Sequence, residues 1–251
     1  LLLQFRGGLG MLKAISNVND IIAPALKGAD ATKQRKADEI LIELDGTQNK
    51  SKLGGNATAS VSAAVLKAGA ASLGIPLYQH IGGVNACTLP TPAVITVVGS
   101  TRYGGGQGSG GKPSYSFMCY GFNTFSEASY ACWEVQTAFQ RLMREKYSLG
   151  ISGAMPGFSL IQAGVVEHDR ELWDIMAEAI NSSGNESKVG IQVDVAAGTY
   201  YDKDRDVFVS LFSREDKTKD DLIELYKDMV RDYPFVILED PLDEDDYEGH
   251  A

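Results

Sequence analysis

The sequence predicts an α/β protein in which a helical N-terminal part precedes alternating strands and helices. Up to about Gly83, apolar residues recur at helical spacing and no segment alternates in the manner of a strand. From residue 89 onward, short apolar runs typical of buried strands alternate with amphipathic segments typical of helices. This order favours a parallel α/β sheet or an α/β barrel in the second part.

Two helices are expected in the N-terminal part. Ala37, Ile40, Leu41 and Leu44 follow the i, i+3, i+4, i+7 rule, which predicts a helix over 30–44. An alanine-rich segment predicts a second helix over 56–73, because Pro76 stops its continuation.

The second part combines predicted strands and helices. Thr124 and Glu127 fit a capping box, in which each side chain bonds the other residue's backbone at the start of a helix. Thr218 is expected to cap another helix. Strands are expected at 93–98, 189–195, 207–211 and 235–238, with helices starting at Thr124, spanning about 172–179, and following Thr218.

Composition excludes several classes of partner. The 251 residues carry 23 Lys and Arg against 33 Asp and Glu, a net charge of −10, and show no separate basic patch. Such a chain repels nucleic acid and anionic membranes. No run of eighteen apolar residues predicts a membrane span. The first residues lack a signal peptide and an initiator Met, and we expect a piece of a longer protein.

Three cysteines, Cys87, Cys119 and Cys132, form an odd number whose spacing fits no zinc motif. We expect reduced thiols in a cytosolic protein, because disulfides are rare in that compartment.

A glycine-rich loop between 99 and 114 formally satisfies a phosphate-binding pattern. Gly106, Gly111 and Lys112 match most of a P-loop, but Pro113 stands where a Ser or Thr would hold magnesium. The residues that follow do not read as the helix whose N-terminus would bind phosphate. We therefore expect Gly104 to Gly111 to be an exposed surface loop, and a nucleotide-binding function is the least favoured hypothesis.

Two carboxylates are more informative, because each ends an apolar run. Asp194 closes VGIQVD and Glu239 closes FVILED. Side chains at the carboxyl ends of barrel strands face the active site, and carboxylates there suit magnesium. Each also fits a helix N-cap or a loop acid. The acidic run from Glu239 to Glu248 fits either a solvated loop or a carboxylate cluster beside a divalent cation.

Several long motifs resemble the enolase family. The stretch from Glu43 to Gly83, ELDGTQNKSKLGGNATASVSAAVLKAGAASLGIPLYQHIGG, resembles the helical part of the enolase N-terminal domain. Further along, IQVDVAAGTYY and FVILEDPLDEDDY resemble two enolase barrel strands with their following loops. The resemblance implies a partial enolase fold. Residues 1–88 would be the helical portion of the α+β capping domain, and 89–251 the first part of the TIM-like barrel domain.

The resemblance also implies a reaction. Enolases dehydrate 2-phosphoglycerate to phosphoenolpyruvate in glycolysis with two magnesium ions, a Lys base and a Glu acid. By motif position, Asp194 and Glu239 match two of the three metal carboxylates, and Glu239 also lies where substrate binds. Mg²⁺ is accordingly the cofactor that the resemblance implies.

Other positions depart from the family pattern. Met155 and Ala154 match the Glu acid and its neighbouring Asp, and a thioether has no proton to give. Tyr103 matches the substrate-loop His, and the segment Tyr115–Met118 matches the substrate-contacting Q-E-F-M, which places Ser116 at its carboxylate. The catalytic Lys would lie beyond Ala251. No catalytic residue of the family is therefore expected within this chain.

Two functional hypotheses stand beside the least favoured one, nucleotide binding. One is an enolase-like protein of weak or no activity, resembling the divergent enolase of sperm and other motile flagella, and acting as a structural component of a flagellum or cilium. The other is an active, magnesium-dependent enolase with a rewired acid. Expected partners are a second copy of the chain or a flagellar assembly, together with a phosphorylated small acid. The expected location is the cytoplasm, including a ciliary or flagellar axoneme.

Overall fold

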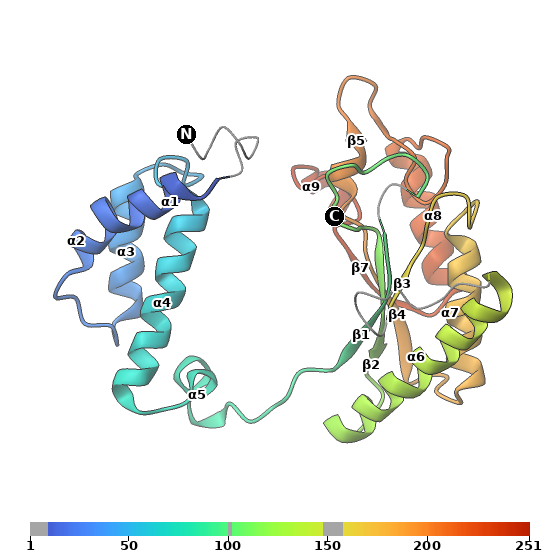
Figure 1. The fold of residues 1–251 in the computed structure, drawn as a ribbon, viewed down its shortest axis with the longest axis horizontal. Helices are drawn as coiled ribbons and strands as arrows, with labels where there is room; N and C mark the ends of the chain where they lie inside the picture. Colours follow the sequence, from blue (N-terminus) through green and yellow to red (C-terminus); the bar gives the residue numbers. More distant parts are fainter. Residues whose placement is uncertain (1–9, 100–101, 148–157) are drawn as a thin grey trace. The chain divides into compact units, whose positions relative to one another are not determined.

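The computed structural model describes residues 10–99, 102–147 and 158–251 (Figure 1). The chain divides into two compact units, Leu1–Thr88 and Leu89–Ala251. Among the described residues, no single helix is long and apolar enough to cross a membrane. Only the helix Gly55–Leu73 with the following segment Leu77–Asn85, bent by 98°, meets the length and composition requirement as a pair.

All the regular secondary structure described in the first unit is helical, as the sequence predicts. Its small core contains Ile22, Leu41, Leu53 and Ala57. The elements in chain order are α1 (Leu12–Ser16), the π-helical turn η2 (Asn17–Ile22), α2 (Ala23–Leu26), α3 (Gln34–Asp45), α4 (Gly55–Leu73), α5 (Leu77–Gly82) and the 3-10 turn η3 (Gly83–Asn85).

The start of α3 differs from the prediction. The helix begins at Gln34 rather than Asp30, because the Asp30 carboxylate accepts hydrogen bonds from the Thr32 amide (2.9 Å) and hydroxyl (2.7 Å). Such a local side-chain turn competes with helical geometry. The α4 helix ends where expected, at a left-handed Gly74 with φ of 68°.

The second unit is an α/β layer built on one five-stranded sheet. Figure 1 shows α6, α7 and α8 on the same side of that sheet. The elements are β1 (Ala93–Val98), β2 (Ser114–Cys119), α6 (Phe125–Tyr147), β3 (Ser159–Leu160), α7 (Arg170–Ser182), β4 (Val189–Asp194), the 3-10 turn η4 (Ala197–Tyr200), β5 (Tyr201–Asp202), β6 (Val207–Phe208), α8 (Lys219–Asp232), β7 (Phe235–Glu239) and α9 (Tyr247–His250).

The sheet is mixed, which corrects the expectation of a parallel sheet and leaves the alternative, an α/β barrel. Its order is β3-β1-β2-β4-β7, and β2 runs antiparallel to both β1 and β4, while β1·β3 and β4·β7 are parallel pairs. The sequence predicts no strand for the segment after the glycine-rich loop. That segment is β2, so no helix follows the loop and a P-loop is excluded.

The core of this unit lies between the sheet and the three helices. Trp173 of α7 is fully buried at its centre, and its ring contacts Phe212, Tyr233 and Phe235 edge-on at centroid distances of 5.5–5.8 Å. Alternation along the strands directs one set of side chains into this core and the other set to the opposite face. The core-facing strand residues include Tyr115, Phe117, Ile191 and Val193.

Of two smaller predicted features, the capping box forms and the strand over 207–211 is shorter than predicted. The Thr124–Glu127 capping box forms, with the Glu127 amide donating to the Thr124 hydroxyl at 3.2 Å. The predicted strand 207–211 ends at Phe208, because Ser210 and Phe212 adopt positive φ values of 51° and 64°. Extended pairing cannot continue through that left-handed backbone.

The glycine-rich loop is packed rather than exposed as a whole. Gly105 and Gly106 are buried against Tyr200 and Val209, whereas Gly104 and Gly108 are exposed. A Cβ at Gly105 would lie 2.0 Å from the Val209 carbonyl oxygen. The absence of side chains therefore lets the loop backbone lie directly on η4 and the β6 region.

A pair of substitutions tests this packing. Gly105→Ala should destabilise the protein by about 1–3 kcal/mol, because the new methyl group meets backbone that must move. Gly108→Ala is the matched control, since nothing lies within 4 Å of its added Cβ. Urea unfolding of both variants measures the difference, and equal stabilities would contradict the packed loop.

Candidate functional site

Asp194 and Glu239 lie side by side at the ends of two neighbouring strands. They are register partners in the parallel β4·β7 pair. The Gln192 amide donates to Glu239 at 3.0 Å, which places Gln192 and Glu239 on the same face of the sheet. Because side chains alternate along a strand, Asp194 shares that face with Gln192, opposite the helices. The structure thus brings together the two carboxylates that the sequence singled out.

Both strands leave this rim through left-handed turns. Ala196 and Asp240 each have φ of 48°, an uncommon conformation for residues with a Cβ. The turns remain linked by backbone hydrogen bonds from Val195 to the Glu239 oxygen and from Ala197 to the Asp240 oxygen, both 3.0 Å. This pairing extends the β4·β7 ladder past the carboxylates and holds both at one edge.

A lysine from the glycine-rich loop completes this arrangement. The Lys112 ammonium forms an ion pair with the Asp194 carboxylate, and their side chains are 30 % and 19 % exposed. Ser114 stands opposite Asp194 in the β2·β4 register, so Lys112, two residues earlier, lies just past the strand ends. The two carboxylates therefore already have partners within the chain, Lys112 for Asp194 and Gln192 for Glu239.

The described residues do not fit a complete magnesium site. Magnesium prefers octahedral oxygen coordination, and this rim offers two carboxylates, one of which is paired with an ammonium. Throughout the described ranges, no three His, Cys, Asp or Glu side chains lie close enough to hold a metal ion.

A second polar cluster lies on the helix side of the sheet, around Asp169 at the start of α7. This carboxylate has no exposed surface. Arg102 binds it in a bidentate manner, through Nε at 2.9 Å and Nη2 at 2.6 Å. The hydroxyls of Tyr103 and Tyr115 donate to it at 2.7 and 2.6 Å, and Trp173 donates to the Tyr115 oxygen at 2.9 Å. Four donated hydrogen bonds thus satisfy one buried charge.

The electrostatics of this cluster favour a charged Asp169 beside neutral tyrosines. Burial alone would raise the pKa of Asp169, but the Arg102 charge and the donated hydrogen bonds hold it below its usual value. Burial, reinforced by the Asp169 charge, raises the pKa of Tyr115 well above its usual value. The same causes raise the pKa of Tyr103. Both hydroxyls therefore remain protonated donors at neutral pH.

The positions that matched the substrate-binding motifs are distributed between the two clusters. Tyr103 and Tyr115 belong to the Asp169 cluster, with their hydroxyls committed to it. Ser116 is half-buried on the opposite face and pairs with Gln192 in the β2·β4 register. Gln192 precedes Asp194 by two residues on the same face of β4, so Ser116 lies next to the carboxylate pair on that face. Met155 and Ala154 lie outside the described residues.

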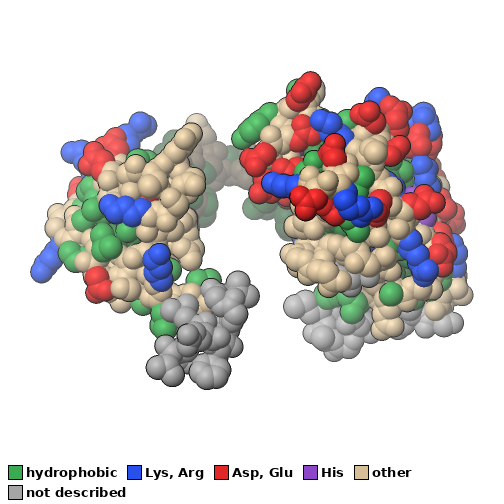
Figure 2. All heavy atoms as spheres, turned by 90° about the horizontal axis from the view of Figure 1, so that it is seen from above, with side chains coloured by type: hydrophobic (Ala, Val, Ile, Leu, Met, Phe, Trp, Pro, Cys, Tyr) green, Lys and Arg blue, Asp and Glu red, His purple; other side chains and the backbone are tan. Residues whose placement is uncertain are grey.

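The acidic run after β7 is largely used in local turns and pairs. Asp243 accepts from the Asp245 amide at 3.1 Å, and Asp246 caps α9 and pairs with Lys219 at 3.1 Å. Figure 2 shows acidic side chains gathered on this end of the second unit, interspersed with lysines and arginines. A cavity of about 150 Å³ lies beside the strand ends and is lined by Ala196, Gly198, Thr199, Asp240, Leu242, Glu244 and His250. These features support the solvated-loop interpretation.

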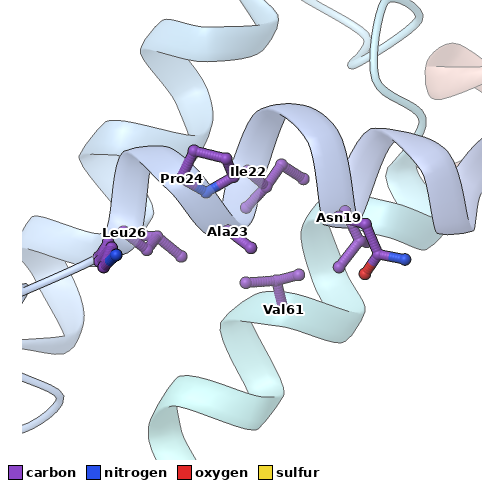
Figure 3. A pocket seen from close by; sticks show the side chains of 8 residues that line it. Asn19, Ile22, Ala23, Pro24, Leu26 and Val61 are labelled. Carbon is purple, nitrogen blue, oxygen red and sulfur yellow. The ribbon is translucent and has the colours of Figure 1, made fainter.

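A further cavity lies in the first unit and has different chemistry. It is an open groove of about 600 Å³ against α4, with Val61 on one side and Ile22, Ala23 and Leu26 on the other (Figure 3). Its polar side chains are Asn19 and Lys27. No carboxylate, imidazole or thiol lines it, so it does not compete as an active site.

Comparison with known proteins decides the family. Residues 4–81 match the family described as "Enolase, N-terminal domain", and residues 86–251 match "Enolase, C-terminal TIM barrel domain". The chain belongs to the enolase family. The five-stranded sheet with its three helices is accordingly part of an enolase barrel, and the first unit is the helical part of the enolase N-terminal domain.

Curated relatives agree with this assignment. The chain is 38 % identical to "Enolase" of Methanopyrus kandleri over 250 residues, covering 98 % of this chain and 56 % of the relative. It is 38 % identical to "Enolase" of Methanococcus aeolicus over 247 residues, with coverages of 98 % and 56 %. For "Enolase" of Anaplasma phagocytophilum the identity is 37 % over 245 residues, with coverages of 97 % and 54 %. The chain thus spans a little over half the length of these relatives.

Sequence reasoning missed the partners of these residues. In the sequence, Lys112 matches only the P-loop pattern. The signal for its role is its position two residues before β2, a strand that the sequence does not predict. Asp169 lies 54 to 67 residues from the partners Tyr115 and Arg102, a separation that no local pattern reveals. The clue available was an Arg–Tyr pair in an otherwise glycine-rich loop.

The Asp169 cluster yields a stability prediction. Arg102→Met should cost about 3–5 kcal/mol at neutral pH, because it leaves a buried carboxylate without its counter-charge. The double variant Arg102→Met, Asp169→Leu should be more stable than the single one, since no unpaired charge remains. Arg141→Met, at an exposed pair 3.6 Å from Glu145, is the control and should change little.

The pH dependence has a defined sign. In the parent protein the depressed pKa of Asp169 contributes stability that is present above about pH 3.9 and lost as pH falls through the folded-state pKa. Without Arg102, burial raises the pKa of Asp169. Protonation of the carboxylate then removes the free-energy cost of burying an unpaired charge. The stability difference between parent and Arg102→Met should therefore shrink as pH falls. A difference independent of pH would contradict the charged assignment.

Proposed function

We propose that the protein containing this chain is an enolase-family member that binds a phosphorylated acid but dehydrates 2-phosphoglycerate slowly or not at all. The observation that carries the proposal is the commitment of Tyr103 and Tyr115 to Asp169. These residues stand where the resemblance places the family's substrate-loop His and substrate-contacting Gln. Hydroxyls bonded to a buried carboxylate in the core are not available to a ligand on the opposite face.

Loss of proton donors supports the same proposal. Hydroxide leaves an enediolate only when it is protonated, and general acids typically contribute about 10²- to 10⁴-fold in rate. At the family's acid position this sequence has Met155, and at the neighbouring carboxylate it has Ala154. Ser116 replaces a further carboxylate on the face that carries Asp194 and Glu239. A serine hydroxyl is far too weak an acid to take over proton donation from the carboxyl groups missing at positions 154, 155 and 116.

The assay measures phosphoenolpyruvate absorbance with full-length protein and excess magnesium. We expect turnover at least about 10²-fold below that of a glycolytic enolase, alongside measurable 2-phosphoglycerate binding by calorimetry. An Asp194→Asn variant shows whether any residual rate belongs to this site. Turnover within tenfold of a glycolytic enolase would sink the proposal and favour the alternative, an active magnesium-dependent enolase with a rewired acid.

A rescue experiment separates a missing acid from a missing base. Ala154→Asp combined with Met155→Glu should raise turnover if the catalytic Lys is present beyond Ala251. The substitution Ser116→Glu, added to that pair, restores the remaining carboxylate. No gain from the triple variant in a protein that contains the Lys would contradict the role given to these positions.

The setting of the protein is also a proposal. Reduced thiols and the family resemblance support a cytoplasmic location, and the net charge of −10 argues against nucleic acid as a partner. We propose that a protein that binds its ligand without fast turnover acts as a component of a homodimer or a larger protein assembly. The narrower expectation of a sperm or flagellar enolase stays a prediction, since the relatives described above are named only as enolases.

A further inference from the structure

The backbone around Lys112 is held from three directions. The Tyr200 hydroxyl donates to the Lys112 carbonyl oxygen at 2.7 Å, and the Ser109 hydroxyl donates to the same atom at 3.2 Å. Arg102 of the Asp169 cluster donates to the next carbonyl, that of Pro113, at 3.3 Å. Lys112 is therefore anchored at the point where the loop enters β2, immediately past the end of β4.

The anchored lysine sets the charge at the strand ends. Its ammonium pairs with Asp194 while the two side chains are only 30 % and 19 % exposed. Partial burial weakens solvent screening, so this pair interacts more strongly than a fully exposed one. The neighbouring carboxylate, Glu239, accepts from Gln192, a neutral donor at 3.0 Å. The Lys112 ammonium is thus paired with Asp194, and the Gln192 amide is hydrogen-bonded to Glu239.

We propose that Lys112 is a built-in competitor of divalent cations at the Asp194–Glu239 pair. A divalent ion can bind Asp194 there only by displacing the ammonium, which remains attached nearby at a high effective concentration. The pair therefore has a lower affinity for magnesium than two free carboxylates in the same positions. This inference rests on the proposed assignment of these carboxylates to the metal side of the site, and it concerns binding rather than turnover.

Calorimetric titration of full-length protein with Mg²⁺ alone tests the proposal. Lys112→Gln should tighten binding about tenfold or more, equivalent to about 1.4 kcal/mol. Lys219→Gln is the matched control, because Lys219 also pairs with a half-buried aspartate, Asp246 at 3.1 Å, outside the strand-end pair. It should leave the affinity within twofold of the parent. Adding Asp194→Asn to Lys112→Gln should abolish the gain.

Each other outcome overturns the proposal. Unchanged or weaker Mg²⁺ binding by Lys112→Gln, or an equal gain from Lys219→Gln, would show that Lys112 does not compete. Lys112→Met serves as a second neutral variant of similar length. If neither neutral variant folds by circular dichroism while Lys112→Arg does, Lys112 is a structural ion-pair partner only. Because turnover is not measured, an active enzyme would refute the proposed function without affecting this result.

Discussion

The second unit is organised around one buried charge. Asp169 has no access to water, and a carboxylate in that position is tolerable only when charged donors and hydrogen bonds replace its hydration. The donors to Asp169 come from two segments, the loop before β2 and the strand β2 itself. Trp173 of α7 donates in turn to the Tyr115 oxygen and so holds that donor in place. Satisfying Asp169 therefore fixes where the loop lies on the sheet, and the loop in turn fixes Lys112.

On both faces of the sheet, polar side chains at the predicted site positions have partners within the chain. On the helix side, two tyrosines that resemblance would assign to substrate recognition serve as donors to Asp169. On the opposite face, Lys112 and Gln192 satisfy the carboxylates that resemblance would assign to metal. Polar groups at the positions of a catalytic site are thus bonded to one another. A site of this kind is stable without a ligand, which is unlike a preorganised active site whose groups wait unpaired for the transition state.

Local patterns predicted the helices and most strands well, because these depend on neighbouring residues. The capping box at Thr124 and the strand 93–98 are examples, and the strand-end positions of Asp194 and Glu239 followed from the same reasoning. What depends on distant residues was not predictable. The segment 114–119 was not assigned as a strand, since its pairing partners are remote. The start of α3 was misplaced because one aspartate bonds its own neighbour, and the burial of Gly105 depends on residues about a hundred positions away.

The reversed direction of β2 has a topological consequence. In a parallel unit, the chain leaves the carboxyl rim of one strand, enters a helix, and returns at the opposite rim. Here β1 and β2 form an antiparallel pair, so the connection between them begins and ends at the same rim. Both ends of the loop therefore lie at this rim, with Arg102 near the end that follows β1 and Lys112 at the end that precedes β2. A hairpin in this place confines the constrained part of the segment to residues such as Arg102 and Gly105, which contact the rest of the unit. Its exposed tip around Gly108 can change in length and charge without disturbing a helix, so the chemistry at this rim can diverge while the barrel around it stays the same.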